Sequence, residues 1–259
     1  MISVEVLLVA AAIAIYIADS AQLLYADEGL IFPVRRRWRA TLGAKQFSLL
    51  GRSVHIPAPF APHRPLFRLT WSASAASEER AVAATGRIRR GKEIERTTAA
   101  KWEALAQRFA PLSLPLWVIA LGLFALLPIG MFSPLGYRAV LPGLLLIYGG
   151  AVWGLAWTWL KRESLRLKRS KWISLAFECL VCPPCALNLV RKLSVRMDEA
   201  LLPGRDLIQA ADMLLHASER STFRQNLIES LEDRMDIDEG STGAFIRRMR
   251  EEIAKESRS

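Results

Sequence analysis

The longest apolar stretch of the chain covers residues 113–160 and carries a single charged residue, Arg138. Each half of this stretch is long enough to cross a bilayer as a helix, because about 20 helical residues span about 30 Å. The sequence Ser133-Pro134-Leu135-Gly136 lies between the halves and supplies turn-forming residues. The pattern therefore predicts a transmembrane helical hairpin over residues 113–160.

A second apolar segment covers residues 6–18, which is short for a membrane span. We expect its helix to continue past Asp19 towards Tyr25. No basic residue precedes the segment, whereas several arginines follow it, so the positive-inside rule places the N-terminus outside. The arginines that follow are Arg35, Arg36, Arg37 and Arg39. We predict an N-terminal transmembrane anchor over residues 1–26, with a cleaved signal peptide as the alternative.

Between the anchor and the hairpin the apolar runs become short. In the last of them Phe67, Leu69 and Trp71 alternate with polar residues, which is the period-two pattern of a half-buried strand. Similar runs predict strands over residues 29–34, 38–43, 46–56 and 65–71, with a turn at Gly51-Arg52-Ser53. We expect one small antiparallel β module of three or four strands over residues 27–72, followed by a polar helical linker over residues 73–112.

After the hairpin the chain becomes basic and then ambiguous. Residues 172–190 are almost long enough to span a membrane, but Glu178 is costly in lipid and Pro183-Pro184 breaks the helical hydrogen bonding. We therefore predict, over residues 161–190, a basic flank and a cysteine-containing helix that is interfacial or re-entrant, with a helix buried against the sheet as the alternative. A helical cytoplasmic tail follows over residues 191–259. Its apolar faces are formed by Leu207, Ile208, Ala211, Leu214 and Leu215, by Phe223, Leu227, Ile228, Leu231 and Met235, and by Phe245, Ile246, Met249 and Ile253.

These segments predict an α-rich integral membrane protein with three transmembrane helices, two of them forming a tight hairpin. The formal net charge is +10, and positive-inside topology accounts for most of this excess without a nucleic-acid partner. Abundant arginine and alanine are typical of GC-rich bacterial genomes. We therefore expect a protein of the bacterial inner membrane, with its N-terminus outside and most of its polar chain in the cytoplasm.

The three cysteines form the sharpest chemical pattern, Cys179-x2-Cys182-x2-Cys185. This spacing resembles the start of a zinc or iron–sulfur site, but the fourth ligand position is Leu189 and the chain has no fourth cysteine. We predict reduced, metal-free packing residues and no cofactor, with the three thiols kept as weak metal candidates. Cys182 and Cys185 also have the spacing of a thiol redox motif, although the double proline between them is atypical.

Basic residues beside the predicted spans form a candidate surface for anions. They are Arg87, Arg89, Arg90, Lys92, Lys161 and Arg162. A solvated positive flank facing the lipid headgroups is the simplest interpretation of this group, and we expect it to contact the anionic membrane surface.

The sequence contains no nucleotide-binding loop, nucleophile elbow or metalloprotease motif, so it names no reaction. The predicted function is a non-enzymatic, membrane-anchored interaction or assembly protein. It would present the β module and the tail to protein partners at the cytoplasmic face. The small residues Gly149, Gly150 and Gly154 would also allow close helix packing in a homo-oligomer. The alternatives are a thiol or metal redox protein, and a membrane enzyme that uses His55, His63 and Arg64.

Overall fold

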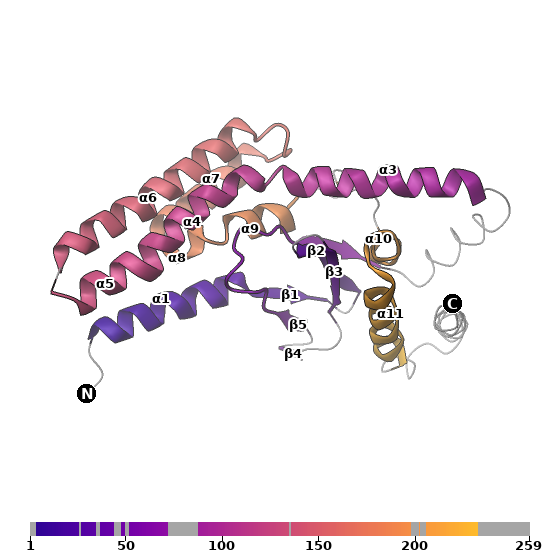
Figure 1. The fold of residues 1–259 in the computed structure, drawn as a ribbon, viewed down its shortest axis with the longest axis horizontal. Coiled ribbons are helices and arrows are strands. Elements are labelled where there is room, and N and C mark those ends of the chain that lie inside the picture. Colours follow the sequence, from indigo (N-terminus) through magenta and orange to yellow (C-terminus); the bar gives the residue numbers. More distant parts are fainter. Residues whose placement is uncertain are drawn as a thin grey trace. The chain divides into compact units, whose positions relative to one another are not determined.

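The computed structural model describes residues 4–25, 27–34, 37–43, 48–49, 52–71, 88–134, 136–197, 202 and 206–232. The chain is helix-rich and contains small antiparallel sheets, which confirms the coarse fold class predicted from the sequence (Figure 1). It divides into two compact units. Unit 1 consists of Met1–Ala21, Ile56–Pro65 and Ala106–Asp198, and unit 2 of Gln22–His55, Leu66–Leu105 and Glu199–Ser259.

The predicted hairpin is the main helical pair of unit 1. Its first arm consists of α4 (Ser113–Leu121), a π-helical turn η2 (Gly122–Leu126) and α5 (Leu127–Phe132), and its second arm is α6 (Tyr137–Leu160). The arms approach closely because glycines lie between them: a Cβ atom on Gly150 would lie only 2.9 Å from the backbone oxygen of Pro115. Gly136 supplies the turn with a backbone φ of +49°, as the turn-forming sequence predicted.

The π-helical turn has a local cause in the sequence. Pro128 cannot donate a backbone hydrogen bond to the carbonyl four residues earlier, and its ring collides with that carbonyl in a regular α-helix. The turn η2 lies directly before α5, in which Pro128 is one of the first two residues. The widened turn therefore lets the helical arm continue through the proline.

Two helical segments of the described chain are long and apolar enough to cross a membrane, Thr98–Phe132 and Arg138–Leu160. The third predicted span is not shown. Helix α1 (Val4–Ser20) ends at Ser20 and does not continue towards Tyr25, because the next residues form strand β1 (Gln22–Leu24). This strand pairs with β5 (Arg52–His55), so the backbone hydrogen-bonding groups of residues 22–24 find partners in a sheet instead of a helix.

The ambiguous segment after the hairpin folds into three short helices. They are α7 (Arg169–Val181), α8 (Pro183–Ala186) and α9 (Leu189–Val195). The break at Cys182 confirms the prediction that the double proline interrupts the helix. Helix α7 packs on the end of α6, where the Trp172 Nε1–H donates to the buried Thr158 Oγ1 at 3.0 Å.

Unit 2 contains two three-stranded antiparallel sheets, whereas the sequence predicted one sheet. Strand β2 (Glu28–Val34) pairs with β3 (Arg37–Leu42) on one side and β6 (Phe67–Thr70) on the other. The second sheet has the order β1-β5-β4, with β4 at Ser48–Leu49. Strand β5 already begins at Arg52, so the predicted turn at Gly51-Arg52-Ser53 was placed too late in the chain.

The core of unit 2 is aromatic. The rings of Trp38, Phe67 and Trp102 contact one another, with centroids 5.3–6.2 Å apart. Trp102 comes from α3 (Ile88–Gln107), within the predicted polar helical linker. Two tail helices belong to the same unit, α10 (Leu207–Leu214) and α11 (Ala217–Glu232).

The tail helices confirm two of the predicted apolar faces in part. Leu207, Ile208, Ala211 and Leu215 are buried around α10, as are Phe223, Leu227 and Ile228 in α11. The third predicted face, at residues 245–253, lies outside the described residues.

Candidate functional site

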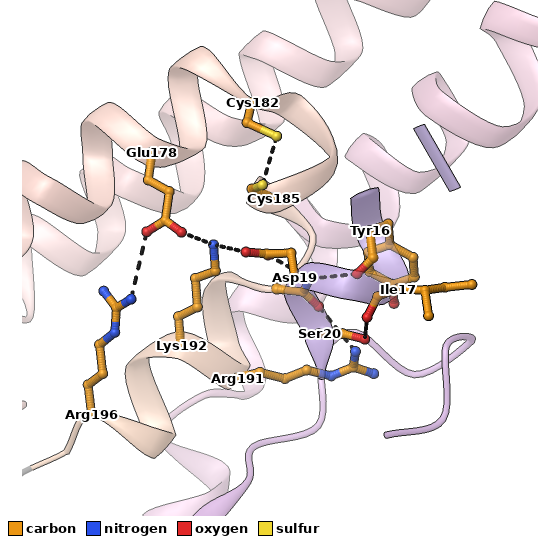
Figure 2. Close-up of polar contacts among 11 residues, drawn as sticks. Tyr16, Ile17, Asp19, Ser20, Glu178, Cys182, Cys185, Arg191, Lys192 and Arg196 are labelled. Atoms are coloured by element: carbon orange, nitrogen blue, oxygen red, sulfur yellow. Dashed lines mark hydrogen bonds and ion pairs between the residues drawn. The ribbon is translucent and has the colours of Figure 1, made fainter. Parts of the chain in front are cut away.

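Unit 1 contains a cluster of four charged side chains around the buried Lys192 (Figure 2). The Lys192 ammonium group from α9 donates to Asp19 Oδ1 at 2.7 Å and to Glu178 Oε1 at 2.5 Å. Asp19 lies in the last turn of α1 and Glu178 in α7. Arg196 completes the cluster, 3.8 Å from Glu178 Oε2. We call these four residues the lysine cluster; it joins three helices and balances two positive charges with two negative ones.

The electrostatics of the cluster favour a charged lysine. Burial alone would lower the pKa of Lys192, since its side chain is only 7% exposed. The hydrogen bonds and negative charges of Asp19 and Glu178 outweigh burial and raise the pKa above its ordinary value. Lys192 therefore keeps its proton over the whole physiological range and acts as a fixed cation, which makes it a poor general base.

A second polar network extends from the cluster to a proline-rich segment. Asn188 donates to Asp19 Oδ2 at 2.8 Å and accepts from Arg191 at 3.1 Å. The Arg191 guanidinium is 1% exposed and donates to the backbone oxygens of Ala58 and Ala61. Burial lowers the pKa of Arg191, but a guanidinium group stays protonated in proteins. Residues of α9 thus hold both the end of α1 and the segment at residues 56–65.

The three cysteines lie around the break between α7 and α8. Cys179 is buried in α7, and desolvation raises the pKa of its thiol to about 12. Cys182 is partly exposed at the break after α7, and its sulfur lies 2.7 Å from that of the buried Cys185. Burial and the contact with Cys182 raise the pKa of Cys185 as well. In the described part of the chain no group of three or more His, Cys, Asp or Glu side chains is placed to hold a metal ion.

The described residues among the predicted anion contacts belong to both units of the chain. Lys161 and Arg162 follow α6 directly, and the Arg162 guanidinium lies 4.2 Å from the centre of the Trp159 ring. Arg89, Arg90 and Lys92 belong to α3, and Arg87 lies outside the described residues. Their contact with an anionic surface stays a prediction.

The residues of the enzyme alternative are divided between the units. His55 belongs to β5 in unit 2, where its ring lies 5.9 Å from that of Phe32. His63 and Arg64 belong to unit 1, and His63 lies beside the ring of Trp117. Burial and the positive charges of Arg64 and Arg191 lower the pKa of His63, which favours its neutral form.

Sequence reasoning missed the lysine cluster. It treated Asp19 as part of a continuing helix and Glu178 only as a cost of insertion. The sequence did contain a signal for the cluster, because Asp19 and Glu178 are isolated carboxylates in apolar segments. Such carboxylates require a cationic partner. The sequence contains many cations, so it could not single out Lys192 as that partner.

The comparisons with known proteins add no relative. No protein-family model matches the chain, no curated protein matches it, and no solved structure matches it. Function therefore has to be inferred from the geometry and chemistry of the chain itself.

Proposed function

We propose that the protein is a non-enzymatic, membrane-anchored interaction or assembly protein of the bacterial inner membrane. Unit 1 would be the membrane anchor, and unit 2 would be presented to protein partners at the cytoplasmic face. The proposal includes three spans, an external N-terminus and an external turn at Arg138. It requires no cofactor and no nucleic acid.

One observation carries the proposal: unit 1 exposes large apolar side chains that water does not favour. Of the large hydrophobic residues exposed in the described part of the chain, all except Leu23 and Tyr25 belong to unit 1. On the hairpin they are Leu114, Trp117, Leu121, Phe124, Ile129, Phe132, Leu141, Leu144, Leu145, Tyr148, Val152, Trp153 and Leu160. An apolar surface of this extent favours lipid as its surroundings.

Helix α1 supports a third span. Val4, Leu7, Leu8, Ile13 and Ile15 are exposed along it. Its 17 residues correspond to about 25 Å, somewhat less than the hydrocarbon core. Asp19, near the end of the helix, is neutralised by Lys192. A short helix whose charge is paired at one end can be accommodated by local thinning of the bilayer.

The lysine cluster would then act as a clamp of the anchor. Its ion pairs join α1 to α7 and α9, which lie far from α1 in the sequence. A buried ion pair gives little net stability, but its loss is costly and it can fix one arrangement of helices. This role explains a charged cluster near apolar helices without assigning it a reaction.

Gly149 gives a specific reason to expect contacts between copies of the chain. A Cβ atom at this position would meet no atom within 4 Å, so the small residue faces open space on α6. Gly150, one residue later, packs against α4. Small residues on an open helix face allow a second helix to approach closely.

Alkaline carbonate extraction of membranes that contain the full chain tests the anchor. We expect the wild type to resist extraction, together with bright cytoplasmic fluorescence from reporters fused after Ser77 and at Ser259. The double variant Leu144→Arg and Leu145→Arg should become extractable, because it places two charges on the exposed face of α6. The matched variant Lys161→Arg and Lys171→Arg should resist extraction like the wild type. A wild type that is released as a soluble protein would overturn the proposal.

A thiol redox activity is the second candidate, because the sulfurs of Cys182 and Cys185 lie 2.7 Å apart. The Cys182 thiolate would attack a small-molecule disulfide, break its S–S bond and release one small thiol. Cys185 would lose its proton, attack the Cys182 sulfur and release the second small thiol. Two protein thiols are thereby oxidised, and one small disulfide is reduced to two thiols.

Equilibration of the full chain with mixtures of glutathione and glutathione disulfide tests this candidate. Mass spectrometry should then detect a peptide in which Cys182 and Cys185 are joined, in the wild type and in Cys179→Ser. A chain that keeps both thiols free in glutathione disulfide would eliminate the redox candidate and leave the cysteines as packing residues.

A further inference from the structure

We propose that a basic cavity in unit 1 binds a phosphate group, supplied by an anionic phospholipid or by a free phosphate compound. The cavity has a volume of about 210 Å³. It is formed by the loop at residues 165–168, the first turn of α7 and the end of α9. Its cationic side chains are Arg166, Lys168, Lys171 and Arg196, and Leu165 and Leu193 are among its apolar ones. The lipid form of the proposal rests on the membrane function proposed above.

The charge of the lining is the main argument. Four cationic side chains line the cavity, of which Arg166, Lys168 and Lys171 are exposed to solvent, and none of its described lining residues is a carboxylate. Arg196 has an ion-pair partner in Glu178, whereas the described residues show no ion pair for Arg166, Lys168 or Lys171. Cations that share a small cavity repel one another, and a bound anion removes that repulsion. The lining therefore selects for negative charge.

The backbone adds to this preference. Helix α7 begins at Arg169, and no side chain caps its N-terminus. The free N–H groups of a first helical turn favour anions, and Lys168 and Lys171, which line the cavity, belong to this part of the chain. The helix end thus adds to the field of the four side chains.

Arg166 shows that the loop is held in an unusual shape. Its backbone φ is +47°, a conformation that L-residues other than glycine rarely adopt. The loop is fixed on both sides: Leu165 is buried, and the Trp172 ring packs against Trp159 with centroids 4.6 Å apart. An arginine kept where glycine would be less strained is consistent with a function of its charge.

The size and position of the cavity limit which ligands it can bind. Its volume of about 210 Å³ leaves room for one phosphate ester. The loop follows α6 directly, after Trp157 and Trp159. Aromatic residues followed by cations are typical of the depth of lipid headgroups. A phospholipid phosphate and a free phosphate compound share the chemistry that the cavity recognises.

Two variants of equal charge test the cavity. The cavity variant carries Arg166→Gln, Lys168→Gln and Lys171→Gln. The flank variant carries Lys161→Gln, Arg162→Gln and Arg169→Gln, residues of the same basic region that do not line the cavity. Each variant loses three positive charges, so general attraction to an anionic surface falls equally in both. Only the first changes the lining.

The lipid arm uses the purified full chain in mixed micelles of phosphatidylglycerol and phosphatidylcholine, with native mass spectrometry of the retained lipid. We expect selective retention of phosphatidylglycerol, reduced at least about tenfold more in the cavity variant than in the flank variant. The free-phosphate arm titrates the same samples with inorganic phosphate in calorimetry. Binding in this arm with no lipid selectivity would assign the cavity to a free phosphate compound.

The proposed phosphate site would be overturned if the cavity variant and the flank variant lost the same amount of phosphatidylglycerol binding. It would also be overturned if the wild type retained both lipids equally and bound no inorganic phosphate. Carbonate extraction of the same proteins reports on the anchor independently, so the two proposals can fail separately. The single variant Arg166→Gly is a control for misfolding of the triple cavity variant. It removes one cation from the lining and at the same time relieves the backbone strain at residue 166. It should weaken binding while thermal stability is unchanged or raised; unchanged binding would contradict the proposal.

Discussion

The two units of this chain differ in where their large apolar side chains lie, although each buries charged groups, among them Arg224 in unit 2. Unit 2 buries the aromatic side chains of Trp38, Phe67 and Trp102, and its Arg39–Glu219 ion pair, 3.6 Å long, lies towards the surface. Unit 1 exposes leucine, phenylalanine and tryptophan along its helices and buries Lys192 and Arg191.

If unit 1 is the membrane anchor proposed above, the contrast reflects two different solvents. In water, burial of apolar surface stabilises a fold, as the core of unit 2 shows. In lipid, exposed apolar side chains cost nothing, and the polar groups are the ones that must find partners inside the protein. The lysine cluster, with Asn188 and Arg191 beside it, is such an internal set of partners.

The largest expected effect comes from Trp102→Ala in unit 2. Trp102 is fully buried between Trp38 and Phe67, so its removal should reduce the free energy of unfolding by about 3–5 kcal/mol. The matched change is Trp117→Ala in α4, where the side chain is 50% exposed. It should cost much less in detergent or bilayer. If chemical unfolding showed the same loss of free energy for Trp102→Ala and Trp117→Ala, the contrast between the two units would be contradicted.

Lys192→Met should have the next largest effect. It leaves Asp19 and Glu178 without their shared cation and should destabilise unit 1 by about 3 kcal/mol. Arg39→Met in unit 2 is the control, because its side chain is 61% exposed and a surface ion pair contributes at most about 1 kcal/mol. Both can be measured by thermal unfolding of the full chain. A small loss for Lys192→Met would show that the cluster is not a clamp.

The pH dependence of the cluster has a defined sign. Because the folded-state pKa of Lys192 is raised above 10.5, its contribution is fully present below pH 10.5 and is lost as the pH rises through the folded value. Thermal unfolding of the wild type should therefore show a loss of stability in strongly alkaline solution that is smaller in Lys192→Met. An identical alkaline profile in both would contradict the assignment.

Cys179 should react slowly with alkylating reagents. With its pKa at about 12, roughly one thiol in a thousand is ionised at pH 9, against about half for an ordinary cysteine. Labelling by iodoacetamide at pH 9 should thus be about 500-fold slower than in the denatured chain, as followed by peptide mass spectrometry. Cys179→Ala should cost about 1 kcal/mol of stability as a loss of packing. Rapid labelling in the folded protein would mean that the thiol is neither buried nor a packing residue.

The smallest expected effect is a gain from Arg166→Gly, about 1 kcal/mol or less. Glycine adopts the φ of +47° without the steric cost that arginine carries there, although it loses more backbone entropy on folding. Thermal unfolding should show a higher midpoint than for Arg166→Ala, which removes the same charge and keeps the strain. A lower midpoint for the glycine variant would show that the backbone at this position is unstrained.

The sequence by itself determined the features that depend on neighbouring residues. The apolar run of residues 113–160 predicted the helical hairpin, and its turn-forming sequence predicted the reversal at Gly136. The double proline predicted the break after Val181, because proline cannot donate within a helix. The alternation of Phe67, Leu69 and Trp71 predicted β6, because successive side chains of a strand point to opposite faces of the sheet.

Only the tertiary structure decided the features that join distant parts of the chain. Helix α1 ends at Ser20 because residues 22–24 pair with β5, and this pairing also divides the expected single sheet into two. The lysine cluster joins Asp19 to residues more than 150 positions later, and the basic cavity combines a loop, a helix start and a helix end. Local pattern cannot specify such partners, because many cations in the sequence have the right charge and only packing brings one of them within hydrogen-bonding distance.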